Sequence, residues 1–153
     1  MVIHSMARRS LDKRLTHLQP TSDLKPPSKG WIKALREALG MTTAQLARRL
    51  GVTQPNVVRL EQSEARRTVT LESLDKVAQA LGCTLVYALV PNRPLEAMVL
   101  EQAEKLASKH LLASGHSMRL ENQGIGQNDE RELARQLVDD LMRGKQSRLW
   151  DDS

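Results

Sequence analysis

Apolar residues recur every three or four positions along most of this chain, which is the spacing of one buried face on an α-helix. Two proline-containing stretches, KPPSKG at 25–30 and PNRP at 91–94, divide the pattern into three parts. Between them, four closely spaced segments have the helical period: 31–39, 44–50, 54–62 and 71–81. Residues 83–90, CTLVYALV, are instead a short run of apolar and β-branched residues, which predicts a β-strand. The fold class that we expect is mainly α, with one strand.

The residues that flank the four central segments fit helix boundaries. A threonine, whose hydroxyl can accept a backbone N–H, precedes three of the segments, and a glycine, which enters the left-handed conformation without strain, follows three of them. The threonines are Thr42, Thr53 and Thr70, and the glycines are Gly40, Gly51 and Gly82. Residues 26–92 therefore predict a small helical domain that ends in the strand at 83–90.

The two outer parts of the sequence also predict helices. Residues 1–25 predict an N-terminal helical arm in which Ser5 caps a helix over 6–18. This helix is too short to be stable alone and must dock on another element. Residues 93–153 predict a C-terminal helical region.

The C-terminal region divides into two helices. The first begins near Pro94 and is interrupted at Gly115, with a short turn after it. The second is capped by Asn128 and ends at Gly144. Trp150 is interpreted as an anchor that buries a large apolar area in this chain or in a partner.

Basic residues are concentrated in the first half of the chain. Lys and Arg number 23 against 18 Asp and Glu, which gives a net charge of +5 and a pI near 9.7. Residues 1–25 contain five basic and two acidic side chains, and residues 26–67 contain eight and three. Residues 68–90 and 91–153 carry net charges of −1 and −2. A face that binds a polyanion is therefore expected in the first half.

Composition also argues against several classes of protein. Aromatic residues make up only 2% of the chain, so stacking of single-stranded bases is not expected. The histidines lack metal-ligand spacing, no glycine-rich phosphate loop occurs, and the single cysteine, Cys83, lies in the apolar strand. We expect no enzyme activity, cofactor or metal.

No apolar run approaches the ~20 residues that span a bilayer and no secretory signal is evident, so we expect a cytoplasmic protein.

Residues 43–62, TAQLARRLGVTQPNVVRLEQ, have the internal chemistry of a helix-turn-helix. Ala47 lies where two helices cross closely, and Gly51 supplies the positive φ of the turn between them. The predicted apolar interior is Leu46, Leu50, Val52, Val57 and Leu60. The polar side chains that project outward from the second helix are Thr53, Gln54, Asn56 and Arg59, and they suit base edges in the major groove. The alternative is a packed bundle whose charged face is only solvated.

The region from about residue 30 to residue 82 resembles the phage-repressor-like (XRE) helix-turn-helix family. The resemblance implies base contacts by Gln54, Asn56 and Arg59, and phosphate contacts by Thr43, Gln62, Arg66 and Arg67. In that family an arginine of the first helix pairs with a glutamate at the end of the recognition helix, and Arg36 and Glu61 hold those positions here. Pro55 departs from the more usual polar residue and removes one potential base contact.

The predicted strand at 83–90 needs a partner, because an isolated apolar strand has unpaired backbone groups on both edges. No second strand is evident in the chain. Antiparallel pairing of two copies about a two-fold axis would satisfy it and place two recognition helices about one turn of DNA, or ~34 Å, apart. We therefore expect a homodimer on double-stranded operator DNA. The alternative is a strand that packs against its own domain.

A second motif lies in the C-terminal region. SMRLEN at 117–122 fits the pattern [S/T]-x-x-x-E-[G/N] and resembles the inhibitory helix that restrains Fic-domain enzymes, which transfer AMP from ATP onto protein hydroxyls. The resemblance implies that Glu121 occupies the place of the ATP γ-phosphate, that Ser117 anchors the helix and that Asn122 contacts the rim of the pocket. The alternative is a solvated turn.

The whole chain closely resembles the family called mobile mystery protein A. The segments that carry the resemblance include TLVYALVP, SMRLENQ and the terminal RLWD. Members of that family are encoded beside a Fic-domain protein, mobile mystery protein B. The resemblance implies an antitoxin that binds its promoter as a dimer and inhibits a Fic toxin through Glu121. The alternative is a stand-alone repressor whose C-terminal helices only pack or dimerise.

Overall fold

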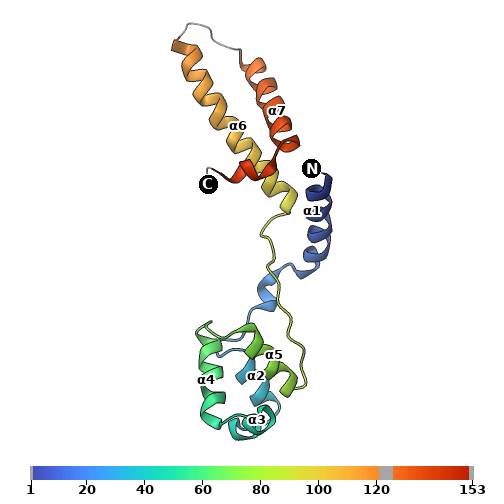
Figure 1. Ribbon diagram of the computed structural model, residues 1–153, viewed down its shortest axis with the longest axis vertical. Helices are drawn as coiled ribbons and strands as arrows, with labels where there is room; N and C mark the ends of the chain where they lie inside the picture. Colours follow the sequence, from blue (N-terminus) through green and yellow to red (C-terminus); the bar gives the residue numbers. More distant parts are fainter. Residues whose placement is uncertain (1, 121–125, 152–153) are drawn as a thin grey trace. The chain divides into compact units, whose positions relative to one another are not determined.

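The computed structural model describes residues 2–120 and 126–151, and these are mostly helical (Figure 1). The α-helices are α1 (Val2–Leu15), α2 (Trp31–Ala38), α3 (Thr43–Leu50), α4 (Gln54–Ala65), α5 (Leu71–Ala80), α6 (Leu95–Leu120) and α7 (Gln127–Arg143). The 3-10 helices are η1 (Thr16–Leu18), η2 (Thr21–Leu24) and η3 (Gln146–Trp150). The predicted mainly α fold is confirmed. Among these helices, none is both long enough and apolar enough to cross a membrane.

The chain folds into two compact units, each with its own core. Residues 20–89 form the four-helix unit, which contains α2 to α5. Residues 1–19 and 90–153 together form the hairpin unit, which contains α1, α6, α7 and η3.

The four-helix unit is built around small and aliphatic side chains contributed by all four of its helices. The buried residues of this core are Ile32, Leu46, Ala47, Val57, Val77 and Leu81. Val52, which was predicted to belong to the interior, is 39% exposed. It directly follows Gly51, where the turn between α3 and α4 faces solvent, so that prediction is wrong.

Local capping explains where these helices begin. Thr42 and Gln45 form a reciprocal capping box at the start of α3, and the Thr70 hydroxyl accepts the Ser73 N–H at the start of α5. Thr53 holds the N-cap position of α4 but its side chain makes no capping hydrogen bond. The predicted boundaries are confirmed at all three threonines, although Thr53 caps through its backbone alone.

The hairpin unit packs α6 against α7, with η3 closing one side of the core. Leu149 of η3 is 1% exposed, and Gln102 of α6 donates a hydrogen bond to its carbonyl at 2.7 Å. Trp150 is 48% exposed. Within this chain the anchor is therefore Leu149 and not the predicted Trp150.

The first helix docks on the start of α6, as its short length requires. Arg8 and Glu96 form an ion pair at 2.7 Å, and Arg8 also donates to Gln146 at 2.8 Å. The Asp12 carboxylate accepts the N–H of Leu95 at 2.8 Å and that of Glu96 at 3.5 Å, so α1 caps α6.

Three helix limits in the hairpin unit differ from the prediction. The helices α1 and α7 begin before Ser5 and Asn128, so neither residue is the cap. The backbone of α6 continues through Gly115 to Leu120. One glycine costs a helix only about 1 kcal/mol relative to alanine, which is too little to end a helix with so many leucine and alanine residues around it.

The predicted strand is absent. Residues 83–90 have no regular secondary structure, and the part of the chain that the structure describes contains no strand. Apolar and β-branched composition favours a strand only where a neighbouring edge supplies ladder hydrogen bonds. No segment within 2–120 or 126–151 supplies such an edge, so the prediction is not supported in a single chain.

Candidate nucleic-acid interface

The helices α3 and α4 meet in the geometry that the sequence predicts for a helix-turn-helix. Ala47 is buried where the two helices cross, and Gly51 has a φ of +68° at the turn. The Val52 N–H donates to the Ala47 carbonyl at 3.0 Å and ends α3 sharply. Pro55 lies in the first turn of α4, where its missing N–H leaves no bond unmade.

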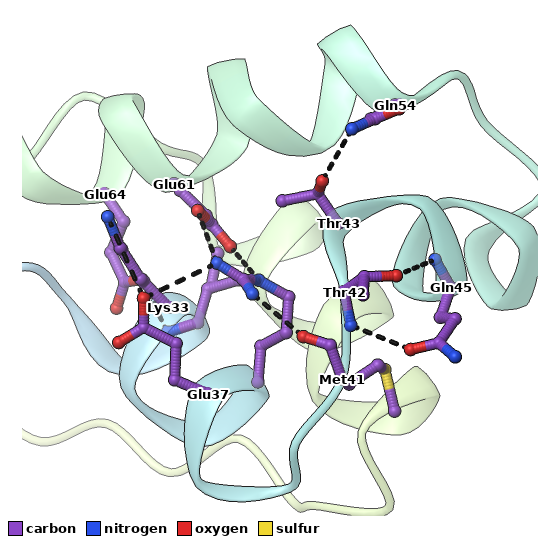
Figure 2. A network of polar contacts seen from close by, with 11 residues as sticks. Lys33, Glu37, Met41, Thr42, Thr43, Gln45, Gln54, Glu61 and Glu64 are labelled. Carbon is purple, nitrogen blue, oxygen red and sulfur yellow. Dashed lines mark hydrogen bonds and ion pairs between the residues drawn. The ribbon is translucent and has the colours of Figure 1, made fainter.

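The first of the two acidic residues of α4 is neutralised inside the unit. Glu61 accepts hydrogen bonds from Arg36 of α2 at 2.6 and 3.3 Å, and both residues are 8% exposed (Figure 2). The hydrogen bond that Arg36 donates to Glu61 raises the pKa of Arg36 above its ordinary value. Arg36 also donates to the Met41 carbonyl at 2.9 Å, so one guanidinium joins three segments. The predicted structural pair is confirmed.

The second acidic residue, Glu64, caps α2. Its two carboxylate oxygens accept the N–H groups of Trp31 and Ile32, each at 2.8 Å. The residue before this helix is Gly30, at a φ of +85°, and a Cβ there would lie 2.6 Å from the Glu64 carboxylate. Sequence reasoning missed this role. The available signal was a helix start that has glycine where serine, threonine or aspartate is usual.

The outward face of α4 consequently has amide and guanidinium groups but no acid. The exposed side chains there that make no hydrogen bond or ion pair with any other described residue are Thr53, Asn56, Arg59, Gln62, Arg66 and Arg67. These are the predicted contact residues, brought onto one helix and its C-terminal end. Hydrogen-bond donors of this kind match phosphate oxygens and the acceptors of guanine and adenine edges.

Two further predicted residues contact each other. Gln54, the first residue of α4, donates from Nε2 to the hydroxyl of Thr43, the first residue of α3, at 2.8 Å (Figure 2). The contact holds the Gln54 side chain across the turn. It uses one of the two amide hydrogens, so the other hydrogen and the carbonyl oxygen can still pair with an adenine edge.

The C-terminal end of α4 has an unusual backbone conformation. Arg67 has a φ of +60°, and its N–H and that of Thr68 donate to the carbonyls of Glu64 and Ser63 at 2.9 and 2.8 Å. This is the Schellman arrangement, in which glycine normally occupies the left-handed position. The corresponding positions of α2, α3 and α5 are Gly40, Gly51 and Gly82. Arginine is thus held where glycine fits better.

The second motif lies partly outside the described residues. Ser117 belongs to the helical backbone of α6, whereas Glu121 and Asn122 fall between the described ranges. Within those ranges, no three His, Cys, Asp or Glu side chains gather in a way that would hold a metal ion.

A comparison with protein-family models matches residues 32–87 to the helix-turn-helix family. This segment is an XRE-type helix-turn-helix domain, a family of DNA-binding modules, and the corresponding part of the predicted resemblance is confirmed. The match does not extend to residues 1–31 or 88–153, which include the SMRLEN motif. Neither the comparison with curated proteins nor the one with solved structures found a match.

Proposed function

We propose that this chain is a transcription regulator that inserts α4 into the major groove of double-stranded operator DNA. The observation that carries the proposal is the disposition of charge on α4. Both of its acidic side chains are occupied by α2, and the charged side chains that it leaves exposed are all basic. A duplex with a charge every few ångströms is the partner that such a face fits.

The roles of the side chains follow from what each can donate. Gln54, Asn56 and Arg59 lie on the first two turns of α4, which enter the groove in this class of domain, and we assign them to base edges. The groups at the ends of the helices are assigned to phosphates: Thr43, Thr53, Gln62, Arg66 and Arg67. The Thr53 hydroxyl is available for this because it makes no capping bond.

Binding of mutants to DNA tests this assignment. The operator is first obtained by selecting bound duplexes from a random library, and affinities are then measured by gel shift across salt concentrations. Arg59→Ala should lose about 1–3 kcal/mol and relax base preference at one position. Arg66→Ala should weaken binding to all sequences equally and make the salt dependence shallower. An unchanged base preference in Arg59→Ala would contradict the assignment to bases.

We also propose that the regulator is a homodimer joined through residues 83–90. In this stretch Val86 is 79% and Leu89 91% exposed. The backbone groups of 84–89 form no hydrogen bond to any other part of the described chain. Antiparallel pairing with a second copy would bury these side chains and satisfy the backbone. Analytical ultracentrifugation should give a dimer for the wild type and a monomer for Val86→Lys, whereas a monomeric wild type would exclude the pairing.

We propose, more specifically, that the regulator is the antitoxin of a toxin–antitoxin pair whose toxin is a Fic-domain enzyme. This finer proposal rests on the SMRLEN motif and on the resemblance to mobile mystery protein A, and the helical backbone of α6 up to Leu120 is compatible with an inhibitory helix. Glu121 would occupy the γ-phosphate position of the partner's ATP, where a carboxylate can accept paired bonds from an arginine. Ser117 and Asn122 would hold the segment in place.

Co-expression with a Fic-domain protein encoded beside this chain tests the finer proposal. Glu121→Gly should release transfer of AMP onto protein hydroxyls and arrest growth, with operator binding unchanged. The same substitution at Glu104, an exposed acid of α6, is the matched control and should release neither. If Glu121→Gly is as harmless as the control, the chain is a stand-alone repressor whose C-terminal helices only pack.

A further inference from the structure

The first helix, α1, shares the charge arrangement of α4. It contains four basic residues and one acid, Asp12, and that carboxylate is occupied by the N-terminal N–H groups of α6. Arg8 is directed inward to Glu96 and Gln146. The remaining cations, Arg9, Lys13 and Arg14, are exposed. Asp12 of α1 thus caps another helix, as Glu64 of α4 does, and the exposed Lys and Arg side chains of α1 leave its surface positively charged.

We propose that Arg9, Lys13 and Arg14 form a second phosphate-binding surface, which contacts the DNA backbone that flanks the operator. The inference rests on the proposed function, because the helix-turn-helix domain supplies the specific site beside which α1 would act. The partner is chosen by charge complementarity. Three exposed cations lie on two adjacent helical turns and form no ion pair with any described residue, although Arg9 acts electrostatically on the Glu96 carboxylate of α6.

The covalent link between α1 and α2 favours contact of α1 with the DNA next to the operator. Residues 16–30 join α1 to α2, and a fully extended chain of that length spans at most about 50 Å. Once α4 is bound, α1 is therefore restricted to DNA within one to two turns of the site. Its local concentration there is high, so individually weak phosphate contacts add to the affinity.

The helix α7 provides a comparison within the same unit. It also has three exposed arginines, Arg131, Arg135 and Arg143, but it contains five acids as well. Arg135 lies 3.9 Å from the carboxylate of Glu132. The α7 arginines are thus the same in number and similarly exposed, yet they are surrounded by negative charge and should not attract phosphates.

The experiment compares two triple variants with the same change in net charge. Binding to a mixed-sequence duplex of about 40 base pairs, roughly four helical turns, is measured by fluorescence anisotropy from low to high salt. R9Q/K13Q/R14Q should make the slope of log K against log salt shallower by about 2–3, and R131Q/R135Q/R143Q should leave it unchanged. The lysine variant R9K/R14K, which keeps the charges, should retain the wild-type slope.

Equal slopes in the two triple variants would overturn the inference, provided that Arg66→Ala still lowers the slope. If the wild type itself does not bind duplex DNA, the proposed function fails first, so the two failures are distinguishable.

Ile3 and Met6 are exposed beside the cations, which is also typical of helices that lie on membranes. Binding of the wild type to phosphatidylserine vesicles through these cations, with an unchanged DNA slope, would assign α1 to lipid and overturn the proposal.

Discussion

Replacing Arg67 with glycine should make the four-helix unit more stable and its binding to DNA weaker. Arg67 has a φ of +60° at the end of α4. The left-handed conformation costs a residue with a side chain about 1–2 kcal/mol, whereas glycine loses about 0.5–1 kcal/mol more backbone entropy on folding. The difference favours the R67G variant by about 0.5–1 kcal/mol. Loss of the guanidinium removes one phosphate contact and should make the salt slope shallower by about 0.9.

The two effects have opposite signs, which makes the test sharp. Urea denaturation of the full chain measures the free energy of unfolding, and anisotropy titrations with duplex DNA measure the salt slope. Arg67→Lys should keep both values near wild type, because it keeps the charge and the strain. If R67G is less stable than the wild type, the strain argument is wrong. If R67G is more stable but binds DNA with the wild-type slope, Arg67 is not a phosphate contact.

The converse substitution at the end of α3 measures the backbone contribution alone. Gly51 has a φ of +68°, and a Cβ added there would meet no atom within 4 Å. Once the smaller backbone entropy loss of alanine is subtracted, Gly51→Ala should therefore lower the free energy of unfolding by about 0.5–1 kcal/mol, through conformation and not through a clash. A neutral result would mean that the turn can relax, and the gain expected from R67G would then also be smaller.

Three further outcomes concern the polar contacts of the two units. Glu61→Ala should lower the free energy of unfolding by about 3–5 kcal/mol, because Arg36 would remain buried without its partner, and a loss below about 1 kcal/mol in urea denaturation would contradict this. Glu64→Ala should cost about 0.5–2 kcal/mol and Glu64→Gln less, since an amide oxygen can still accept one N–H of α2. The hydrogen bond from Arg8 holds the pKa of Glu96 below its ordinary value. The stability that the ionised Glu96 adds is therefore complete at a pH above the ordinary pKa of a glutamate, and it is lost as the pH falls through the lower pKa of the folded state. The difference in unfolding free energy between wild type and Glu96→Gln should therefore shrink on acidification, and a constant difference would exclude the ion pair as its source.

Helix boundaries in the four-helix unit were predictable because their causes are local. A threonine hydroxyl reaches an N–H three residues ahead, as Thr42 and Thr70 do, and a glycine ends a helix through its own φ. The pairing of Arg36 with Glu61 was predicted across 25 residues only through a family resemblance. No period or spacing in the sequence points to it.

The features that sequence reasoning missed depend on distant partners. The N-terminus of α2 is capped by Glu64, more than 30 residues later, and that of α6 by Asp12, 83 residues earlier than Leu95. In the sequence, neither Glu64 nor Asp12 can be distinguished from the solvated acidic residues that helices commonly carry. The strand at 83–90 failed for a related reason, since composition does not indicate whether a partner edge exists. Burial of Leu149 instead of Trp150 depends on how η3 meets α6, which composition also leaves open.

These distant caps change how the charge of the recognition helix should be counted. Residues 54–67 contain three arginines and two glutamates, a net charge of only +1. Both glutamates face α2, where Glu61 accepts from the Arg36 guanidinium and Glu64 accepts two backbone N–H groups. The phosphates of a bound duplex would therefore meet three cations, while the negative charge of the acids is compensated inside the unit. It follows that Glu64→Gln should reduce stability while leaving the salt slope of DNA binding at its wild-type value. A steeper slope in that variant would show that the Glu64 charge reaches the DNA in spite of the contacts of Glu64 with α2.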